Sequence, residues 1–197
     1  MTAEEYKNKK IELFRVLTGR EEYNEETSTD RELCHKCGGS CCKNYPCVFS
    51  PRDFINIYDS DYMKSILDTG YFVIDTFFRY QADDIIYYIR PRGVEDDNVV
   101  ADPEKRGKRC ILHTDNGCIL DFYTRPSGGA LLIPNPNKIV CKYSCCDDKY
   151  SYSDQYEEWC GYQDVMLELL DFYSDRKIAP NVSKIYKLER IIRQDEI

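Results

Sequence analysis

The sequence has no long uncharged apolar run, whereas a helix that crosses a membrane needs about 20 mostly apolar residues. Charged residues make up 31% of the chain, and the mean hydropathy is -0.59. The first residues read MTAEEYKNKK, without the basic start and apolar stretch of a secretory signal. We therefore expect no membrane partner, a cytoplasmic location and reduced thiols.

Basic residues are scarce relative to acidic ones, with 27 Lys and Arg against 35 Asp and Glu and a formal net charge of -8. Binding to duplex nucleic acid needs clustered cations that neutralise phosphates, so nucleic acid is a poor fit as a partner. The motifs of phosphate-binding loops, serine hydrolases and H-E-x-x-H zinc proteases are also missing. A protein partner or a protein substrate is the remaining expectation.

Cysteine is abundant, with 11 residues in a chain of 197. The count is odd, so intramolecular disulfides cannot pair all of them. Thiols that stay reduced in the cytosol usually serve as metal ligands or catalytic groups. A secreted disulfide scaffold is the competing interpretation.

The densest group of cysteines comprises Cys34, Cys37, Cys41 and Cys42. Two residues separate the first two, which lets a turn bring both sulfurs to one ion. Gly38 and Gly39 allow the left-handed backbone that a chain needs to curl around a metal. Adjacent cysteines on extended backbone point to opposite faces, so Cys41 and Cys42 serve different sites or only one of them binds. This spacing predicts a metal site without naming the metal.

Two further groups of cysteines follow. Cys110 and Cys118 lie at the two ends of a predicted hairpin, where they either approach one centre or pack as core thiols. The last group comprises Cys141, Cys145, Cys146 and Cys160. A C-x-x-S-C-C hexad begins at both Cys37 and Cys141. Either this repeat marks a second metal centre, or it arises by chance.

Histidines and cations accompany these cysteines. His35 lies in the first group and His113 in the predicted hairpin, each as an alternate ligand or as a solvated side chain. Cations beside cysteines lower thiol pKa values and would stabilise an anionic thiolate centre. The cations in question are Lys36, Lys43, Lys108, Arg109 and Lys142.

The apolar periodicity predicts an α+β fold, with a small antiparallel sheet of hairpins, flanking N- and C-terminal helices and irregular cysteine-rich metal-binding loops. Helices are predicted over 2–18 and 60–68, along the apolar stripe at 162–173, and in a last segment after 181. A further helix is predicted to start at Ser50–Asp53. Predicted strands cover 71–80 and 84–90, a hairpin covers 110–123, a surface loop covers 91–109, and irregular backbone covers 124–140. We expect one domain over 1–197, with a core motif at about 34–146 and a helical part at about 152–193.

The cysteine pattern resembles that of bacterial cysteine-cluster proteins described as zinc- or iron-chelating. Their pattern is C-x-x-C-x-x-x-C-C, an Asp-containing helix start, then C-x-x-L, C-x-I-Y and R-P-x-x-C-R. The chain matches the first element in full and the helix start at 50–54. It resembles the fourth element loosely at 110–113, without the usual Pro-Phe, and resembles the fifth at 118–121. Arg125-Pro126 matches the start of the sixth. Gly129 stands where that family places its last cysteine, so either this ligand is lost or Cys141 replaces it from a longer loop.

The resemblance implies a thiolate centre that holds zinc or an iron–sulfur cluster, 4Fe-4S included. The flagellin lysine N-methylase carries a related domain, which implies methyl transfer near an iron–sulfur centre. We therefore expect a metal-binding cysteine-cluster protein. The alternatives are an enzyme that uses an iron–sulfur centre, such as a protein methyltransferase or redox catalyst, and a zinc-stapled protein-interaction module.

Overall fold

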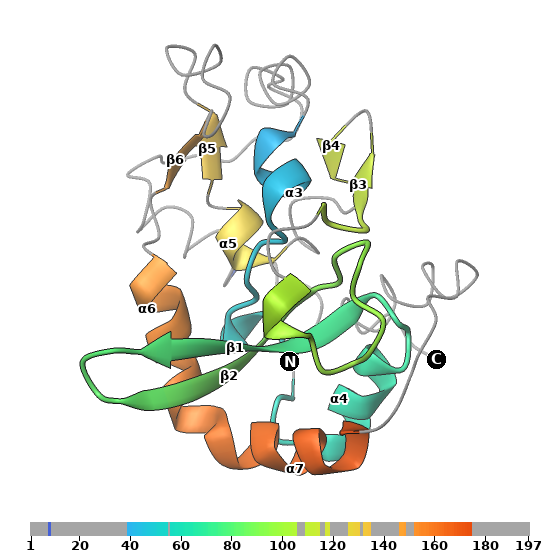
Figure 1. Cartoon of the computed structure of the whole chain (residues 1–197), viewed down its shortest axis with the longest axis vertical. Helices are drawn as coiled ribbons and strands as arrows, with labels where there is room; N and C mark the ends of the chain where they lie inside the picture. Colours follow the sequence, from blue (N-terminus) through green and yellow to red (C-terminus); the bar gives the residue numbers. More distant parts are fainter. Residues whose placement is uncertain are drawn as a thin grey trace.

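The fold is described from a computed structural model, shown in Figure 1. The structure describes residue 8 and residues 39–54, 56–105, 109–114, 117–118, 126–130, 132–134, 146–148 and 152–174. The predicted helices over 2–18 and after 181 lie outside these residues, apart from Asn8, which is helical. The single-domain extent remains a prediction.

The first described segment contains two short helices, α3 (Ser40–Asn44) and η1 (Pro51–Asp53). Ser50 caps η1 by accepting the N–H of Arg52, and the Asp53 carboxylate accepts the Ser50 N–H at 2.9 Å. Pro51 begins the helix, where its missing N–H costs nothing. The predicted helix start is therefore confirmed, although the helix ends after one turn because Phe54 is extended.

Helix α4 (Ser60–Leu67) follows, close to its predicted bounds. Asp59 is its N-cap and accepts the N–H groups of Asp61 and Tyr62, both at 3.0 Å. Gly70 then takes a positive φ of 75°, which ends the turn and leads the chain into the first strand.

Strands β1 (Phe72–Arg79) and β2 (Asp84–Pro91) form the predicted antiparallel hairpin, in which Ile74 pairs with Ile89. The outer edge of β1 meets the chain at Val100, where Ile74 N–H donates to the Val99 carbonyl at 2.8 Å. In β2, the N–H and carbonyl of Tyr87 both bond to a side chain, that of Gln163.

The segment after β2 differs from the predicted surface loop. Asp96, Val99 and Ala101 are buried, and η2 (Pro103–Lys105) adds a helical turn. Residues 92–94 pair with 109–111, since the N–H of Val94 donates to Arg109 and that of Ile111 to Arg92. Low apolar content suggested exposure, but these residues are buried through backbone pairing and ion pairs.

Further short elements lie above the hairpin in Figure 1. Strands β3 (His113–Thr114) and β4 (Gly117–Cys118) form a second hairpin, with Thr114 paired to Gly117. The predicted irregular stretch contains α5 (Ser127–Ala130) and β5 (Leu132–Pro134), and β5 pairs with β6 (Cys146–Asp148). The described strands thus form three separate two-stranded sheets rather than one.

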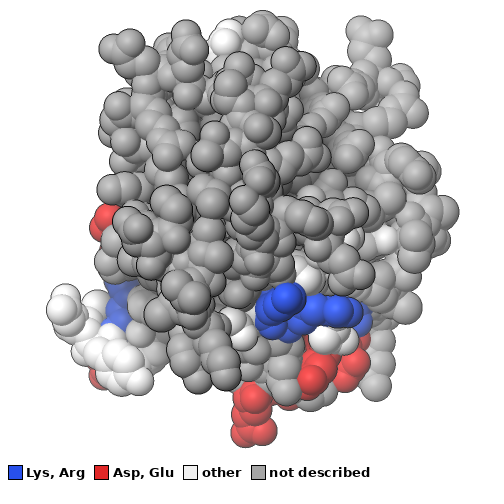
Figure 2. All heavy atoms as spheres, turned by 90° about the horizontal axis from the view of Figure 1, so that it is seen from above, with Lys and Arg blue, Asp and Glu red and all other residues white. Residues whose placement is uncertain are grey.

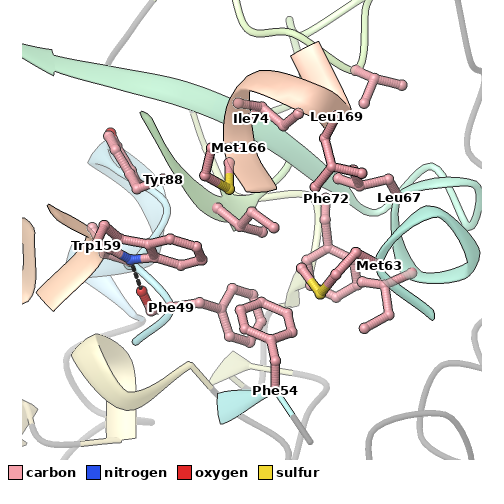
Figure 3. Packing of buried hydrophobic residues seen from close by; sticks show 14 of the residues in the cluster. Phe49, Phe54, Met63, Leu67, Phe72, Ile74, Tyr88, Trp159, Met166 and Leu169 are labelled. Atoms are coloured by element: carbon pink, nitrogen blue, oxygen red, sulfur yellow. Dashed lines mark hydrogen bonds between the residues drawn. The ribbon is translucent and has the colours of Figure 1, made fainter. Parts of the chain in front are cut away.

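The C-terminal helices α6 (Tyr152–Glu157), η4 (Glu158–Tyr162) and α7 (Gln163–Tyr173) cover the hairpin and complete the core. The predicted stripe is confirmed, because Met166, Leu169 and Tyr173 are fully buried. Figure 3 shows aromatic and aliphatic side chains from α7, α4 and the hairpin packed together, with the Trp159 indole donating to the Phe49 carbonyl at 2.7 Å.

The described residues thus confirm an α+β architecture of helices and small antiparallel sheets. None of the helices in the described ranges is long and apolar enough to cross a membrane. On the face drawn in Figure 2, basic side chains of the described residues lie next to acidic ones.

Candidate metal centre

Cys110 lies where two distant parts of the chain meet. It is 4% exposed, belongs to the hydrophobic core and pairs with Gly93 as an isolated antiparallel bridge. Its N–H donates to the carbonyl of Cys42 at 2.8 Å. The first cysteine segment and the chain before β3 are therefore in direct contact.

Two more thiols lie near that of Cys110. Cys47 and Cys118 are close enough that their charge raises its pKa. Burial is the largest cause, and together these effects raise the pKa of the Cys110 thiol from 9.0 to about 12. Cys42 and Cys118 are half-buried and pack against the core beside it. The thiols of Cys47 and Cys118 thus lie near that of Cys110, although Cys47 comes from a distant part of the sequence.

A buried ion-pair network underlies the chain that holds Cys110. Arg90 donates to Asp75 at 2.6 Å and to Asp96 at 2.7 Å, and all three are at most 5% exposed. Burial would lower the pKa of Arg90, but these two carboxylates outweigh burial and raise it. The Asp96 carboxylate also accepts the Gly93 N–H at 2.6 Å. The network therefore fixes the backbone that pairs with Cys110.

Among the described residues, the cation whose charge acts on this thiol is Arg90 of the β1–β2 sheet. The charge of Arg90 lowers the pKa of Cys110 against the dominant effect of burial. Lys43 and Arg109, which the sequence analysis singled out, are exposed. The buried position of Arg90 depends on the β1–β2 pairing, which no spacing of cysteines and cations reveals.

The first cysteine motif is described in part. Gly39 has a φ of 66°, which confirms the left-handed backbone predicted there. Cys41 and Cys42 lie in α3 and not on extended backbone, so the expectation that they point to opposite faces is wrong. Successive helical residues are about 100° apart around the axis. Cys34, Cys37, Gly38 and His35 lie outside the described residues.

The second histidine, His113, lies in β3 and pairs with Cys118 of β4, which makes Cys118 the cross-strand neighbour of a histidine. The backbone N–H of His113 donates to the Cys110 carbonyl at 3.1 Å. The sequence prediction placed Cys110 and Cys118 opposite each other, but the register sets Cys110 three residues before the paired position. Cys118 nevertheless affects the pKa of Cys110, so the two thiols still lie near each other.

Cys160 has different neighbours from those of Cys110. Its sulfur donates to the Glu157 carboxylate at 3.4 Å, and Arg79 bonds to the same carboxylate at 2.9 Å. Burial and this hydrogen bond raise the pKa of Cys160. Arg79 also pairs with Asp84 at the far end of the hairpin. Cys160 is therefore in an acidic setting that charged side chains of the hairpin help to form.

The rest of the last cysteine group is only partly described. Cys146 begins β6, where it pairs with Pro134, and its side chain lies outside the described residues. Cys141 and Cys145 also lie outside them, so the prediction that Cys141 replaces the ligand missing at Gly129 is untested, as is the competing grouping with Cys160. Gly129 itself lies in α5.

Within the part of the chain that the structure describes, no three His, Cys, Asp or Glu residues are arranged to hold a metal ion. Cys34, Cys37 and the Cys41 side chain are not in that part. The structure adds Cys47 to the candidate ligands. Cys47 stands five residues beyond the paired cysteines and so lies outside the C-x-x-C-x-x-x-C-C motif. Its place in the dense segment from Cys34 onward was the available signal.

Comparison of the chain with protein-family models, with curated proteins and with solved structures finds no match.

Proposed function

We propose that this protein binds zinc or an iron–sulfur cluster through thiolates of the first cysteine motif together with Cys47, Cys110 and Cys118. The observation that carries the proposal is that thiols from residues far apart in the sequence gather beside Cys110. The motif at 34–42 is joined to this place by the backbone hydrogen bond between Cys42 and Cys110.

The donor chemistry fits a soft metal. Thiolates bind zinc and iron–sulfur clusters, whereas calcium and magnesium take oxygen ligands. Burial and neighbouring thiols oppose ionisation of Cys110, and a bound cation would reverse that balance by favouring the thiolate. Metal binding would thus stabilise the thiolate form, which burial and neighbouring thiols disfavour in the metal-free protein.

Metal analysis of protein purified without oxygen, together with its visible spectrum, tests this function. Zinc gives a colourless protein with bound metal, while an iron–sulfur cluster gives colour and bound iron with acid-labile sulfide. Cys37→Ser is expected to lower the metal content substantially in either case. Wild-type protein without metal, which also fails to take up zinc or iron and sulfide, would refute the proposal.

A further inference from the structure

Three hydrogen bonds and one close approach fasten α5 to the first cysteine segment. The Asp53 carboxylate accepts the Ser127 N–H at 2.8 Å and the Ser127 hydroxyl at 2.6 Å, across 74 residues of sequence. The Gly128 N–H donates to the Val48 carbonyl at 3.1 Å. Asp53 and Ser127 are both almost fully buried, so water does not compete for these bonds.

Gly128 is required at this contact for steric reasons. A Cβ atom at this position would lie 2.8 Å from the Val48 carbonyl oxygen, and it would also collide with the Gln155 side chain. The Val48 carbonyl oxygen is a backbone atom, so it cannot move aside as the end of a flexible side chain can. The start of α5 therefore lies directly against the residue that follows Cys47.

The contact between α5 and Val48 lies next to Cys47 in the sequence, which relates it to the thiols around Cys110. On one side it holds Val48, whose neighbour Cys47 contributes to the group around Cys110. On the other side it holds the chain that comes from Cys118 and continues towards Cys141. Asp53 already caps η1 through the Ser50 N–H, so its bonds to Ser127 are additional to that local role.

We propose that Asp53, Ser127 and Gly128 act as a clamp that positions the segment bearing Cys47 against α5, which lies between Cys118 and Cys141 in the sequence, for metal binding. This inference rests on the proposed function. The three are positioning residues, since metal ligands must be held within a few tenths of an ångström while the clamp residues themselves donate no ligand. Residues that orient ligands typically change metal affinity by 10- to 100-fold.

Cobalt(II) titration of the metal-free protein tests the clamp, because thiolate-to-cobalt absorption reports both affinity and geometry. Ser127→Ala removes the hydroxyl donor and is expected to weaken cobalt binding about tenfold. Gly128→Ala should weaken it by up to about 100-fold and alter the ligand-field bands, because the added methyl displaces α5. Gly161→Ala is the matched control, since nothing lies within 4 Å of a Cβ there.

Cobalt binding and band shape in both clamp variants equal to those of Gly161→Ala would overturn the inference. Urea unfolding of the metal-free variants shows whether each variant is folded. If Gly128→Ala does not fold, the cobalt affinity of Ser127→Ala alone decides the test. A wild-type protein that shows no thiolate-to-cobalt absorption and takes up neither zinc nor iron with sulfide refutes the proposed function and the clamp together. The two failures are therefore distinguishable by the behaviour of the wild type.

Discussion

Cys110 combines two properties that both oppose its ionisation in a metal-free protein. It is deeply buried, and it has two other thiols near it, so its charged form is disfavoured. A thiol in such a place remains protonated until a cation arrives or the pH becomes strongly alkaline. The chemistry of this residue in the metal-free protein should therefore be that of an inert thiol.

Alkylation of metal-free protein measures this property. The shift of the Cys110 pKa from 9.0 to about 12 lowers its thiolate fraction near neutral pH by about a thousandfold, and burial slows access further. We expect Cys110 to react with iodoacetamide far more slowly in native protein at pH 8 than in urea, as peptide mass spectrometry would show. Equal rates in the two conditions would contradict the burial of this thiol.

The same shift sets a direction for stability against pH. The folded state holds the Cys110 proton more tightly than the unfolded state does. The thiol therefore contributes its full stabilisation below pH 9, and this is lost as the pH rises towards 12. Metal-free protein should accordingly unfold more readily above pH 9.

Sequence reasoning reached some residues of the site and missed others for one physical reason. Gly39 and the Ser50–Asp53 cap follow from local backbone requirements, and both were predicted. Arg90 and Cys47 acquire their roles from contacts between distant segments. Local spacing cannot supply such contacts, because they depend on the pairing of β1 with β2 and on the packing of the core.

At the scale of elements, the β1–β2 hairpin depends on a side chain for part of its edge. Gln163 of α7 accepts the Tyr87 N–H at 2.9 Å and donates to the Tyr87 carbonyl at 3.0 Å. An amide matches the donor and acceptor of one residue in the way a neighbouring strand would. It thereby links the C-terminal helix to the sheet and blocks this position against pairing with another chain.

Gln163→Ala leaves both groups of Tyr87 without this partner, so we expect a loss of about 1–3 kcal/mol in the free energy of unfolding. Urea denaturation at constant metal content measures the change. Gln81→Ala in the exposed turn of the hairpin is the control, with an expected change within about 0.5 kcal/mol. A Gln163→Ala midpoint equal to that of Gln81→Ala would show that the amide adds no stability.

Elements with strong local signals were predicted, and those made by long-range pairing were not. The hairpin strands are rich in β-branched and aromatic residues, α7 has a clear periodicity, and α4 is followed by Gly70. The segment 92–102 has neither signal, yet several of its residues are buried because it pairs with β1 and with 109–111.

For the whole molecule, the described elements separate into two regions. In Figure 1, α4 and α7 lie on the lower side of the hairpin, whereas α3, β3, β4 and β6, which carry or adjoin cysteines, lie on the upper side. The large buried side chains belong mainly to the hairpin and the helices packed on it. A metal centre in the upper region would join short elements that have little apolar surface of their own.

The most direct test of the thiolate centre is the metal content of Cys47→Ser, measured per chain after purification without oxygen. This residue was identified by the structure and not by the motif. We predict that Cys47→Ser loses bound metal relative to wild type, while Cys160→Ser keeps the metal of this group because Cys160 has Glu157 and Arg79 as neighbours. Metal content in Cys47→Ser equal to that of wild type would contradict the account.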